Sequence, residues 1–234
     1  IWTGTETSRR AIPSAWRSHK MKLYLIRHGQ TDWNVAGKIQ GCHDIPLNAT
    51  GKRQAEYLAE GMSRRPVTHI FSSPQKRALE TAQAIAGRQG VGVTALSGLR
   101  EVEFGGWEGL TWKEIEAKDP ERYAKWVETP AKVTPPGGES RAQIMERVGA
   151  AVEEILAAAK GDVAVVSHGA ALVYAIAYML RNEVEHHEET IVKNVSSPTM
   201  EYDRASGPFR LLEANDVSHL PASQKEARPG VVTF

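Results

Sequence analysis

Short apolar segments alternate with longer segments of helical periodicity along most of this chain, and the alternation limits the folds that the chain can adopt. The short segments, rich in aliphatic and β-branched residues, are residues 22–26, 69–73, 91–96 and 162–168. The segments with helical periodicity are residues 50–65, 75–88, 139–160 and 170–180. Strands that are separated by helices form a mostly parallel sheet with helices on both faces. We therefore predict an α/β fold, a three-layer α/β/α sandwich.

The ends of these segments refine the prediction. We expect Thr50 and Ser140 to cap the helices that follow them, because a hydroxyl oxygen accepts hydrogen bonds from the first backbone amides of a helix. The short segments at residues 199–203 and 209–214 are expected to form an antiparallel edge. The predicted central sheet is thus mostly parallel with one antiparallel edge strand.

We expect one folded domain over residues 21–220, with a small cap formed by residues 104–138. Residues 1–20 show no clear periodicity and lack the apolar stretch of a signal peptide, so we predict a leader or appended segment outside the fold. Residues 221–234 are polar and interrupted by proline, which predicts a flexible tail.

The composition excludes several classes of partner. The chain has 234 residues, with 29 basic and 28 acidic side chains and a net charge of +1, so no basic surface for nucleic acid or an anionic membrane is expected. No apolar run approaches the roughly 20 residues that span a bilayer. Cys42 is the single cysteine, which fits a reducing cytoplasm and is typical of a small loop residue rather than a nucleophile. A small-molecule ligand is the expected partner, and a homodimer is left open.

Polar residues follow three of the predicted strands, at the point where each strand ends. These groups are Arg27-His28-Gly29, Ser72-Ser73-Pro74 and Ser167-His168-Gly169, and Arg77 follows the second group in the first turn of a helix. In sheets of this kind, ligands bind beyond the carboxyl ends of the strands. If the three strands are neighbours, two histidines and two arginines meet at the carboxyl ends of the strands.

Such a set of side chains fits a phosphate dianion. Arg27 and Arg77 present guanidinium forks that match phosphate oxygens, and helix amino termini near Arg77 and Gly169 add backbone donors. The two cations disfavour protonation of His28, and a neutral imidazole nitrogen is a competent nucleophile toward phosphorus. His168 is then available to hold a proton and to stabilise the charge that spreads over the equatorial oxygens.

Two assignments stay open on the residues alone. A leaving alkoxide needs a proton, which a carboxylic acid kept neutral by its surroundings would supply, and Asp32 and Glu101 are both candidates. The segment IQGCHDIPL contains Gln40, Gly41 and His43. These three residues either line the rim of the pocket or form a structural loop, and neither alternative is favoured.

Four segments of the chain occur in the order RHGQTDWN, SSPQKRALETA, LREVEFGGWEG and VSHGA. Together they resemble the signature segments of the histidine phosphatase superfamily, also called the phosphoglycerate mutase-like family. The resemblance extends from residue 22 to about residue 220, and the four segments in this order are far more specific than an RHG tripeptide alone. It implies the phosphoglycerate mutase-like fold for the chain.

The resemblance also assigns roles to individual residues. It implies that His28 becomes a phosphohistidine and that Glu101, rather than Asp32, is the general acid. It implies that the residues in contact with the phosphoryl group are Arg27, Arg77, His168 and Asn34, to which we add Gly169 and Gln40. Without the resemblance, Asn34 is equally typical of a turn or a helix cap. The family uses no metal, and we expect neither a metal nor a cofactor, because an arginine and histidine pocket already supplies positive charge.

The length of one segment favours a branch of the family. Mutases of the family resemble this chain at the same segments but carry a longer insertion between the acid and the second histidine, whereas the stretch from Glu101 to His168 is compact here. The resemblance therefore implies the phosphatase branch and a metal-independent phosphomonoester hydrolase. A cofactor-dependent phosphoglycerate mutase is the first alternative, and a non-catalytic phospholigand-binding protein is the second.

Other conspicuous residues have ordinary structural explanations. Trp107, Trp112 and Trp126 either form an apolar wall for the substrate or pack in the core. Ser73 is interpreted as a helix cap rather than a ligand. The cluster of histidine and glutamate at residues 186–189 is interpreted as a solvated helix end, because no matching metal ligands occur elsewhere in the chain.

Overall fold

The computed structural model describes residues 20–129, 132–181 and 193–222. Most of the predicted leader and tail lies outside these residues, and so does the cluster at residues 186–189. No helix within the described ranges is long and apolar enough to cross a membrane.

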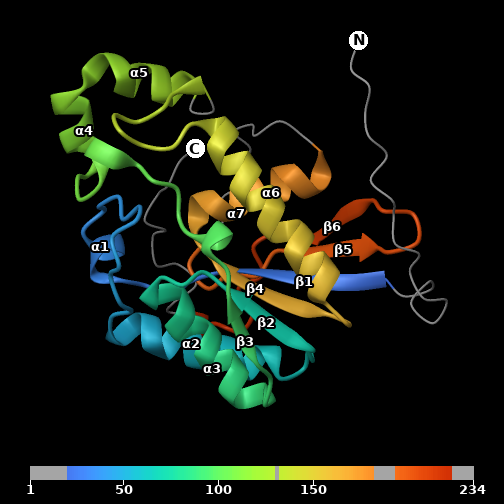
Figure 1. Cartoon of the computed structure of the whole chain (residues 1–234). Coiled ribbons are helices and arrows are strands. Elements are labelled where there is room, and N and C mark those ends of the chain that lie inside the picture. The colour runs from blue at the N-terminus through green and yellow to red at the C-terminus, as the bar shows by residue number, and fades with distance from the viewer. Residues whose placement is uncertain (1–19, 130–131, 182–192, 223–234) are drawn as a thin grey trace, which may run out of the picture.

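A single sheet forms the centre of the described part of the chain (Figure 1). Its strands lie in the order β3 (Val93–Ala95), β2 (His69–Ser72), β4 (Val163–Ser167), β1 (Lys20–Arg27), β5 (Thr199–Asp203) and β6 (Phe209–Glu213). The first four are parallel to one another, and β5 runs antiparallel to both β1 and β6. The predicted α/β class and mostly parallel sheet are confirmed. The strand of opposite direction is β5, and β6 pairs outside it at the edge.

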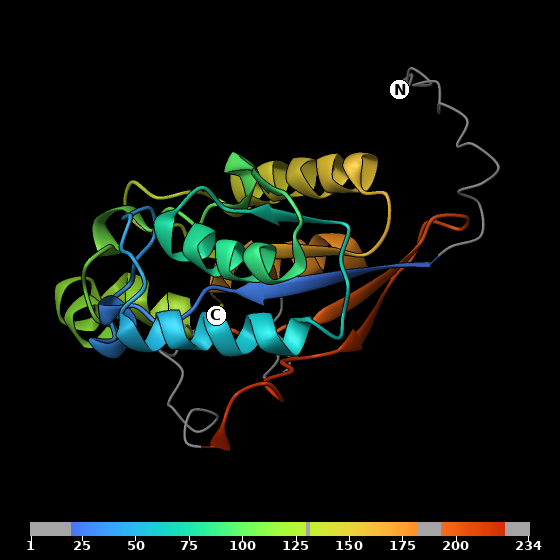
Figure 2. The same ribbon diagram turned by 90° about the horizontal axis from the view of Figure 1, so that it is seen from below.

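Two pairs of helices cover the two faces of the sheet (Figures 1 and 2). The helices α2 (Ala49–Met62) and α3 (Lys76–Gln89) lie on one face, and α6 (Arg141–Ala158) and α7 (Gly169–Leu180) lie on the other. Successive residues of β1 alternate between the two apolar cores: Leu23 and Leu25 pack on the side of α6 and α7, and Tyr24 and Ile26 pack on the side of α2 and α3. This alternation follows from the two-residue period of a strand and completes the three predicted layers.

Of the caps predicted for α2 and α6, one is confirmed and one is wrong. Ser140 caps α6 as predicted and forms a reciprocal capping box with Gln143. The cap of α2 is Asn48 instead of Thr50, and its side-chain oxygen accepts a hydrogen bond from Gly51 N at 2.8 Å. Asn and Thr are both good caps, but Asn48 has the extended backbone that a cap requires, and Thr50 is already inside the first turn.

The predicted cap region lies beside the carboxyl ends of the parallel strands (Figure 1). Its helical elements are η3 (Gly105–Trp107), α4 (Trp112–Lys118) and α5 (Pro120–Glu128). The rings of Trp107 and Trp126 are buried with their centroids 5.3 Å apart, and Trp112 stacks on Trp126 at 6.0 Å. The tryptophans therefore pack on one another and on the main apolar core, which supports the core-packing interpretation.

Candidate active site

The two histidines meet because β1 and β4 are adjacent parallel strands in register. Arg27, the last residue of β1, pairs with Ser167, the last residue of β4, so His28 and His168 both come directly after the paired ends. Their ring centroids are 5.2 Å apart, and the rings are tilted by 58°. Both side chains are buried, with 2% and 0% of their surface exposed.

The backbone of its own loop fixes the tautomer of His28. The ring atom Nδ1 lies 2.6 Å from the carbonyl oxygen of Gly29, which only accepts hydrogen bonds, so Nδ1 carries the proton and Nε2 keeps a free lone pair. Burial lowers the pKa of His28 well below its usual range, and the positive charges of Arg77 and Arg27 lower it further against the opposing effect of the Gly29 carbonyl. The ring is therefore neutral at pH 7, with Nε2 unprotonated.

Arg77 and Ser73 hold His168 from its two sides. Arg77 Nε donates a hydrogen bond to His168 Nδ1 at 3.1 Å, and His168 Nε2 lies 2.8 Å from Ser73 Oγ. Because a guanidinium only donates, the proton of the neutral ring is on Nε2. Burial and the charge of Arg77 lower the pKa of His168 well below its usual range. Ser73 thus contacts a site residue, and the helix cap predicted for it is wrong, because Gln75 occupies the cap position of α3.

Arg77 is completely buried and connects α3 to the loop that follows α1 (Asp32–Val35). Its Nη1 donates to the carbonyl of His43 at 2.6 Å, and its Nη2 donates to the carbonyl of Gly41 at 2.9 Å. Burial lowers the pKa of Arg77 to about 10, while Glu101 and Asp44 oppose the shift. The guanidinium therefore remains charged at pH 7.

Arg27 contributes a second buried cation. Only 3% of its surface is exposed, and burial lowers its pKa while the nearby Glu101 raises it. A Cβ atom at Gly169, the first residue of α7, would lie 3.5 Å from Cζ of Arg27, so the start of this helix rests against the guanidinium. A helix amino terminus and an arginine side chain both attract anions.

Glu101 lies at the amino terminus of α7, beside these cations. Its Oε1 accepts hydrogen bonds from Ala171 N at 3.0 Å and Val102 N at 2.9 Å, and its Oε2 accepts one from Ala170 N at 3.4 Å. Asp32, the other candidate acid, is exposed in α1. Of the two carboxyl groups left open by the residues alone, only Glu101 is in the site.

The remaining predicted binding residues lie at the rim. Asn34 Oδ1 accepts a hydrogen bond from Thr31 N at 3.0 Å in the capping box of α1, in which Thr31 is the cap and Asn34 is the third helical residue. Gln40 is buried, and its Oε1 accepts a hydrogen bond from Thr31 Oγ1 at 3.0 Å. Contact of Asn34, Gln40 and Gly169 with a phosphate stays a prediction.

The structure adds two residues that sequence reasoning missed. Gln75 donates to the carbonyl of Gly41 at 3.0 Å and accepts from Glu101 N at 2.8 Å, so it joins the loop that holds Arg77 to the acid. Asn194 donates from Nδ2 to the backbone carbonyl of His28 at 2.8 Å. Gln75 stands inside the recognised segment SSPQKR, which was a usable signal, whereas Asn194 stands in a stretch without any motif.

Neither a metal centre nor a reactive thiolate is evident in the described part of the chain. No three His, Cys, Asp or Glu side chains converge there in a way that could hold an ion. Burial raises the pKa of the Cys42 thiol to about 11, with a further contribution from Glu108. Cys42 is thus an inert loop residue at pH 7, as its sequence context predicted, and independence from metals stays a prediction.

Taken together, a neutral imidazole with an unprotonated Nε2, a second imidazole and two buried arginines lie close to one another, and this arrangement suits a tetrahedral anion such as a phosphoryl group. The sequence model of the histidine phosphatase superfamily (branch 1) matches residues 23–216. The chain belongs to this superfamily, which confirms the interpretation of the four sequence segments.

Some relatives of the chain are named as phosphatases and others as phosphoglycerate mutases. The chain is 40% identical over 135 residues to phosphoserine phosphatase 1 of Hydrogenobacter thermophilus, a match that covers 58% of this chain and 64%, just under two thirds, of that relative. It is 34% identical over 208 residues to a probable phosphoglycerate mutase of Proteus mirabilis, covering 86% and 95% of the two chains. A solved mycobacterial glucosyl-3-phosphoglycerate phosphatase in complex with VO3 superposes with a TM-score of 0.75 at 32% identity, over 83% of this chain and 99% of that one.

Proposed function

We propose that this protein is a phosphomonoester hydrolase that acts on small phosphorylated metabolites through a phosphohistidine at His28, without a metal. The observation that carries the proposal is the 2.6 Å contact between His28 Nδ1 and the carbonyl of Gly29 in a buried, electropositive pocket. This contact keeps the proton on Nδ1 and leaves Nε2 unprotonated at the pH of the cell. An activated nucleophile of this kind has no evident purpose in a domain that only binds phosphate.

In the first step, His28 Nε2 attacks phosphorus, the P–N bond forms and the bond from phosphorus to the leaving oxygen breaks. Arg27 and Arg77 stabilise the charge on the equatorial oxygens. The Nε2–H of His168 donates to Ser73 Oγ in the structure and exchanges that partner for the phosphoryl group when the substrate binds. Glu101 gives a proton to the leaving oxygen, so that an alcohol departs instead of an alkoxide. The products of this step are the alcohol and the phosphorylated enzyme.

In the second step, a water molecule attacks phosphorus and the P–N bond breaks. Glu101, now deprotonated, accepts the proton of the water, and His28 returns to its neutral form. Inorganic phosphate leaves the pocket. One carboxyl group thus acts first as an acid and then as a base.

The names of the relatives support a small, acidic metabolite as the substrate. Phosphoserine and glucosyl-3-phosphoglycerate both carry a carboxylate near the phosphoester, and we propose a substrate of the same class. The mutase-named relative keeps isomerisation as the second candidate. The compact stretch between Glu101 and His168 favours hydrolysis, because a mutase must retain its intermediate while a hydrolase need only admit water. We further propose that the protein is cytoplasmic and does not bind nucleic acid. A homodimer is compatible with this proposal.

The proposal is tested by activity on 4-nitrophenyl phosphate in excess EDTA. We expect turnover by the unmodified protein, and a loss of several orders of magnitude in His28→Ala. His69→Ala, at the start of β2, is the matched control and should retain activity. Brief incubation with labelled substrate should leave a label on the protein that survives alkali and is lost in acid, as expected for a phosphohistidine.

Two outcomes would favour the alternatives. Interconversion of phosphoglycerate isomers that is stimulated by a bisphosphate primer, and that exceeds phosphate release, would identify a mutase. Tight binding of phosphate without turnover of any phosphomonoester would identify a binding protein. Activity that EDTA abolishes and a divalent metal restores would contradict the metal-independent mechanism.

A further inference from the structure

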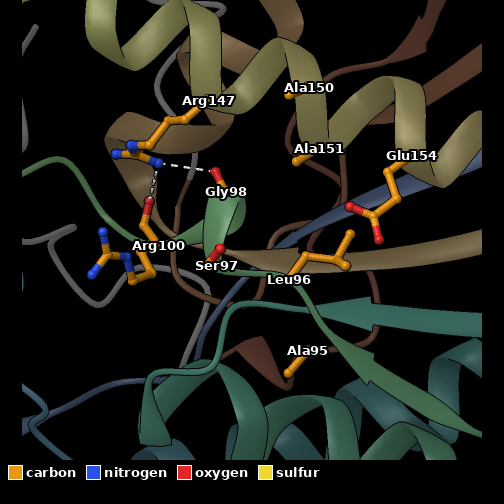
Figure 3. Close-up of a pocket in the computed structure, with 9 residues that line it drawn as sticks. All are labelled: Ala95, Leu96, Ser97, Gly98, Arg100, Arg147, Ala150, Ala151 and Glu154. Atoms are coloured by element: carbon orange, nitrogen blue, oxygen red, sulfur yellow. Dashed lines mark hydrogen bonds between the residues drawn. The ribbon is translucent and has the colours of Figure 1, made fainter.

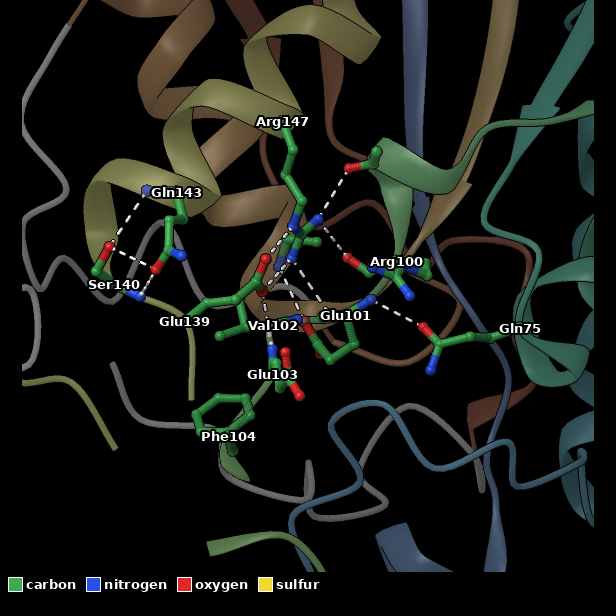
Figure 4. A network of polar contacts seen from close by, with 12 residues as sticks. Gln75, Arg100, Glu101, Val102, Glu103, Phe104, Glu139, Ser140, Gln143 and Arg147 are labelled. Carbon is green, nitrogen blue, oxygen red and sulfur yellow. Dashed lines mark hydrogen bonds and ion pairs between the residues drawn. The ribbon is translucent and has the colours of Figure 1, made fainter. Parts of the chain in front are cut away.

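Arg147, in the middle of α6, uses every hydrogen-bond donor that it has (Figure 4). A guanidinium carries five N–H groups. Two of them reach the carboxylate of Glu139, at 2.6 and 2.7 Å. The other three reach the backbone carbonyls of Gly98 (2.9 Å), Arg100 (2.9 Å) and Glu101 (3.2 Å). The side chain therefore binds the backbone of the segment that leads up to the proposed acid, Glu101.

Glu139 binds the backbone just after the acid, at Glu103. Its backbone N–H donates to the carbonyl of Glu103 at 2.9 Å, and its Oε2 accepts from the backbone N–H of Glu103 at 2.9 Å. Although burial opposes it, the hydrogen bonds from Arg147 and Glu103 lower the pKa of Glu139. Its charge is therefore retained at pH 7, where it pairs with the guanidinium of Arg147.

The two side chains together immobilise the backbone on both sides of Glu101. Gly98 and Arg100 are held from α6, Glu103 is held by Glu139, and Gln75 holds Glu101 N from the opposite side (Figure 4). The carboxyl group of Glu101 is then fixed at the amino terminus of α7. A general acid contributes fully only when its carboxyl group stands within hydrogen-bond distance of the leaving oxygen.

A groove of about 530 Å³ lies beside this network, between α6 and the segment that leads from β3 into η2 (Ser97–Leu99) (Figure 3). Arg147, Arg100 and Glu154 are among its lining residues, so a ligand-binding role for Arg147 is the competing explanation. Figure 3 shows Arg147 turned toward the carbonyl groups of Gly98 and Arg100. With its five donors already engaged, Arg147 has none left for a ligand in the groove.

We propose that Arg147 and Glu139 form a clamp that positions Glu101 for proton transfer to the leaving oxygen. The inference rests on the proposed function, because it requires Glu101 to be the general acid. Arg147 and Glu139 are positioning residues: they act through the backbone of residues 98–103 and do not touch the substrate. Loss of the clamp should therefore damage protonation of the leaving group and leave nucleophilic attack by His28 largely intact.

Leaving-group dependence separates these two effects. The leaving group of 4-nitrophenyl phosphate departs as a stable anion and needs little help from an acid, whereas an alkyl phosphate such as glycerol 3-phosphate depends on protonation. The quantity to measure is kcat/KM, since it covers the steps up to departure of the leaving group. We compare Arg147→Met and Glu139→Gln with Glu101→Gln, and Arg141→Met, in the first turn of the same helix, is the matched control.

We expect kcat/KM for the alkyl phosphate to fall roughly 10- to 100-fold in both clamp variants, as for a catalytic group displaced by about 1 Å. For the aryl phosphate we expect a fall of less than about threefold, so the alkyl-to-aryl ratio drops as it does in Glu101→Gln. Arg141→Met should keep the ratio of the unmodified protein. Glu139→Gln retains the shape of the side chain and reports on the clamp if Arg147→Met does not fold.

Three results would overturn the inference, and they are distinguishable. Equal losses on both substrates in the clamp variants would indicate a role in stability alone. A normal ratio in the clamp variants together with a lowered ratio in Glu101→Gln would refute the clamp and keep the acid. A normal ratio in Glu101→Gln itself, or no hydrolysis by the unmodified protein, would refute the proposed mechanism and the clamp with it.

Discussion

Arg77 Nε and His168 Nδ1 are joined by a hydrogen bond of 3.1 Å inside a pocket that excludes solvent from both side chains. The arginine comes from α3 and the histidine from the loop before α7, so the bond connects helices on opposite faces of the sheet. It also decides which nitrogen of His168 carries the proton. A single guanidinium therefore sets both the position and the tautomer of the second imidazole.

Replacing Arg77 with lysine should lower kcat/KM for 4-nitrophenyl phosphate roughly 100- to 1000-fold, the usual cost of removing a donor from a site of developing charge. Lysine keeps the positive charge but lacks the planar fork that holds His168, Gly41 and His43 at once. Arg88→Lys, in the last turn of the same helix, changes a half-exposed arginine and should leave kcat/KM unchanged. Steady-state kinetics of both variants checks the expectation, and similar activity of the two would contradict it.

A pH titration should show that the His28 ring takes up a proton only at a lower pH than an ordinary histidine. Burial, Arg77 and Arg27 hold the pKa of His28 well below its usual range, so the ring should remain neutral when the pH falls from about 7.5 to about 5.5, where an ordinary histidine becomes charged. Side-chain ¹⁵N NMR, with the resonance assigned by its loss in His28→Ala, provides the measurement. A midpoint near pH 6.5 would show that the pocket does not protect the neutral form.

The same shift makes folding depend on pH. Below about pH 6.5 the unfolded chain binds protons at His28 and His168 that the folded protein does not bind. The free energy of unfolding should therefore fall as the pH decreases from about 6.5 toward 5. Urea unfolding at several pH values measures this slope, and the slope should be smaller in His28→Ala. A slope of equal size in that variant would argue against the assignment.

Close approach of α2 to the loop after His28 should make Gly51 intolerant of a side chain. An added Cβ would overlap the carbonyl oxygen of Gln30, so Gly51→Ala should lower the free energy of unfolding by about 1–3 kcal/mol. Gly87 lies inside α3 with nothing within 4 Å of an added Cβ. Gly87→Ala should instead stabilise the protein by about 0.4–1 kcal/mol. Urea unfolding of the two variants should therefore give shifts of opposite sign.

Asn194 should matter for catalysis more than for stability. It donates one hydrogen bond of 2.8 Å to the carbonyl of His28, and the next residue, Val195, donates its backbone N–H to the carbonyl of Arg27 at 3.0 Å. Asn194→Ala removes the first bond and should lower kcat/KM roughly 2- to 10-fold, the usual net value of one hydrogen bond. Asn194→Asp, which loses the donor and places a negative charge against the carbonyl of His28, should lower kcat/KM at least as much. An Asp variant with full activity would refute the role of this bond.

The sequence predicted the site best where a candidate site residue directly follows a recognisable strand. The strands that end in Arg27-His28 and in Ser167-His168 were predictable, because polar residues directly after an apolar run mark the carboxyl end of a strand, where ligands bind in sheets of this kind. Glu101 could not be chosen over Asp32 from the residues alone. Its placement depends on backbone amides of α7, which stand about seventy residues later in the chain, and contacts of that kind leave no local pattern.

Residues that act through the backbone were the least predictable. Asn194, Arg147 and Glu139 bind main-chain atoms, and every residue offers the same main-chain atoms whatever its side chain. Ser73 was misassigned because serine before a helix is a common cap. Here the cap position falls two residues later, at Gln75. The three tryptophans were ambiguous because packing and substrate contact require the same apolar surface.

The pairing of Arg27 with Ser167 has a consequence for how such proteins diversify. Backbone hydrogen bonds between β1 and β4 fix the spacing of His28, the proposed nucleophile, and His168, so surrounding loops can change in length or composition without moving the two rings. New substrate preferences can then arise in the surrounding segments while the reactive pair stays where the sheet puts it.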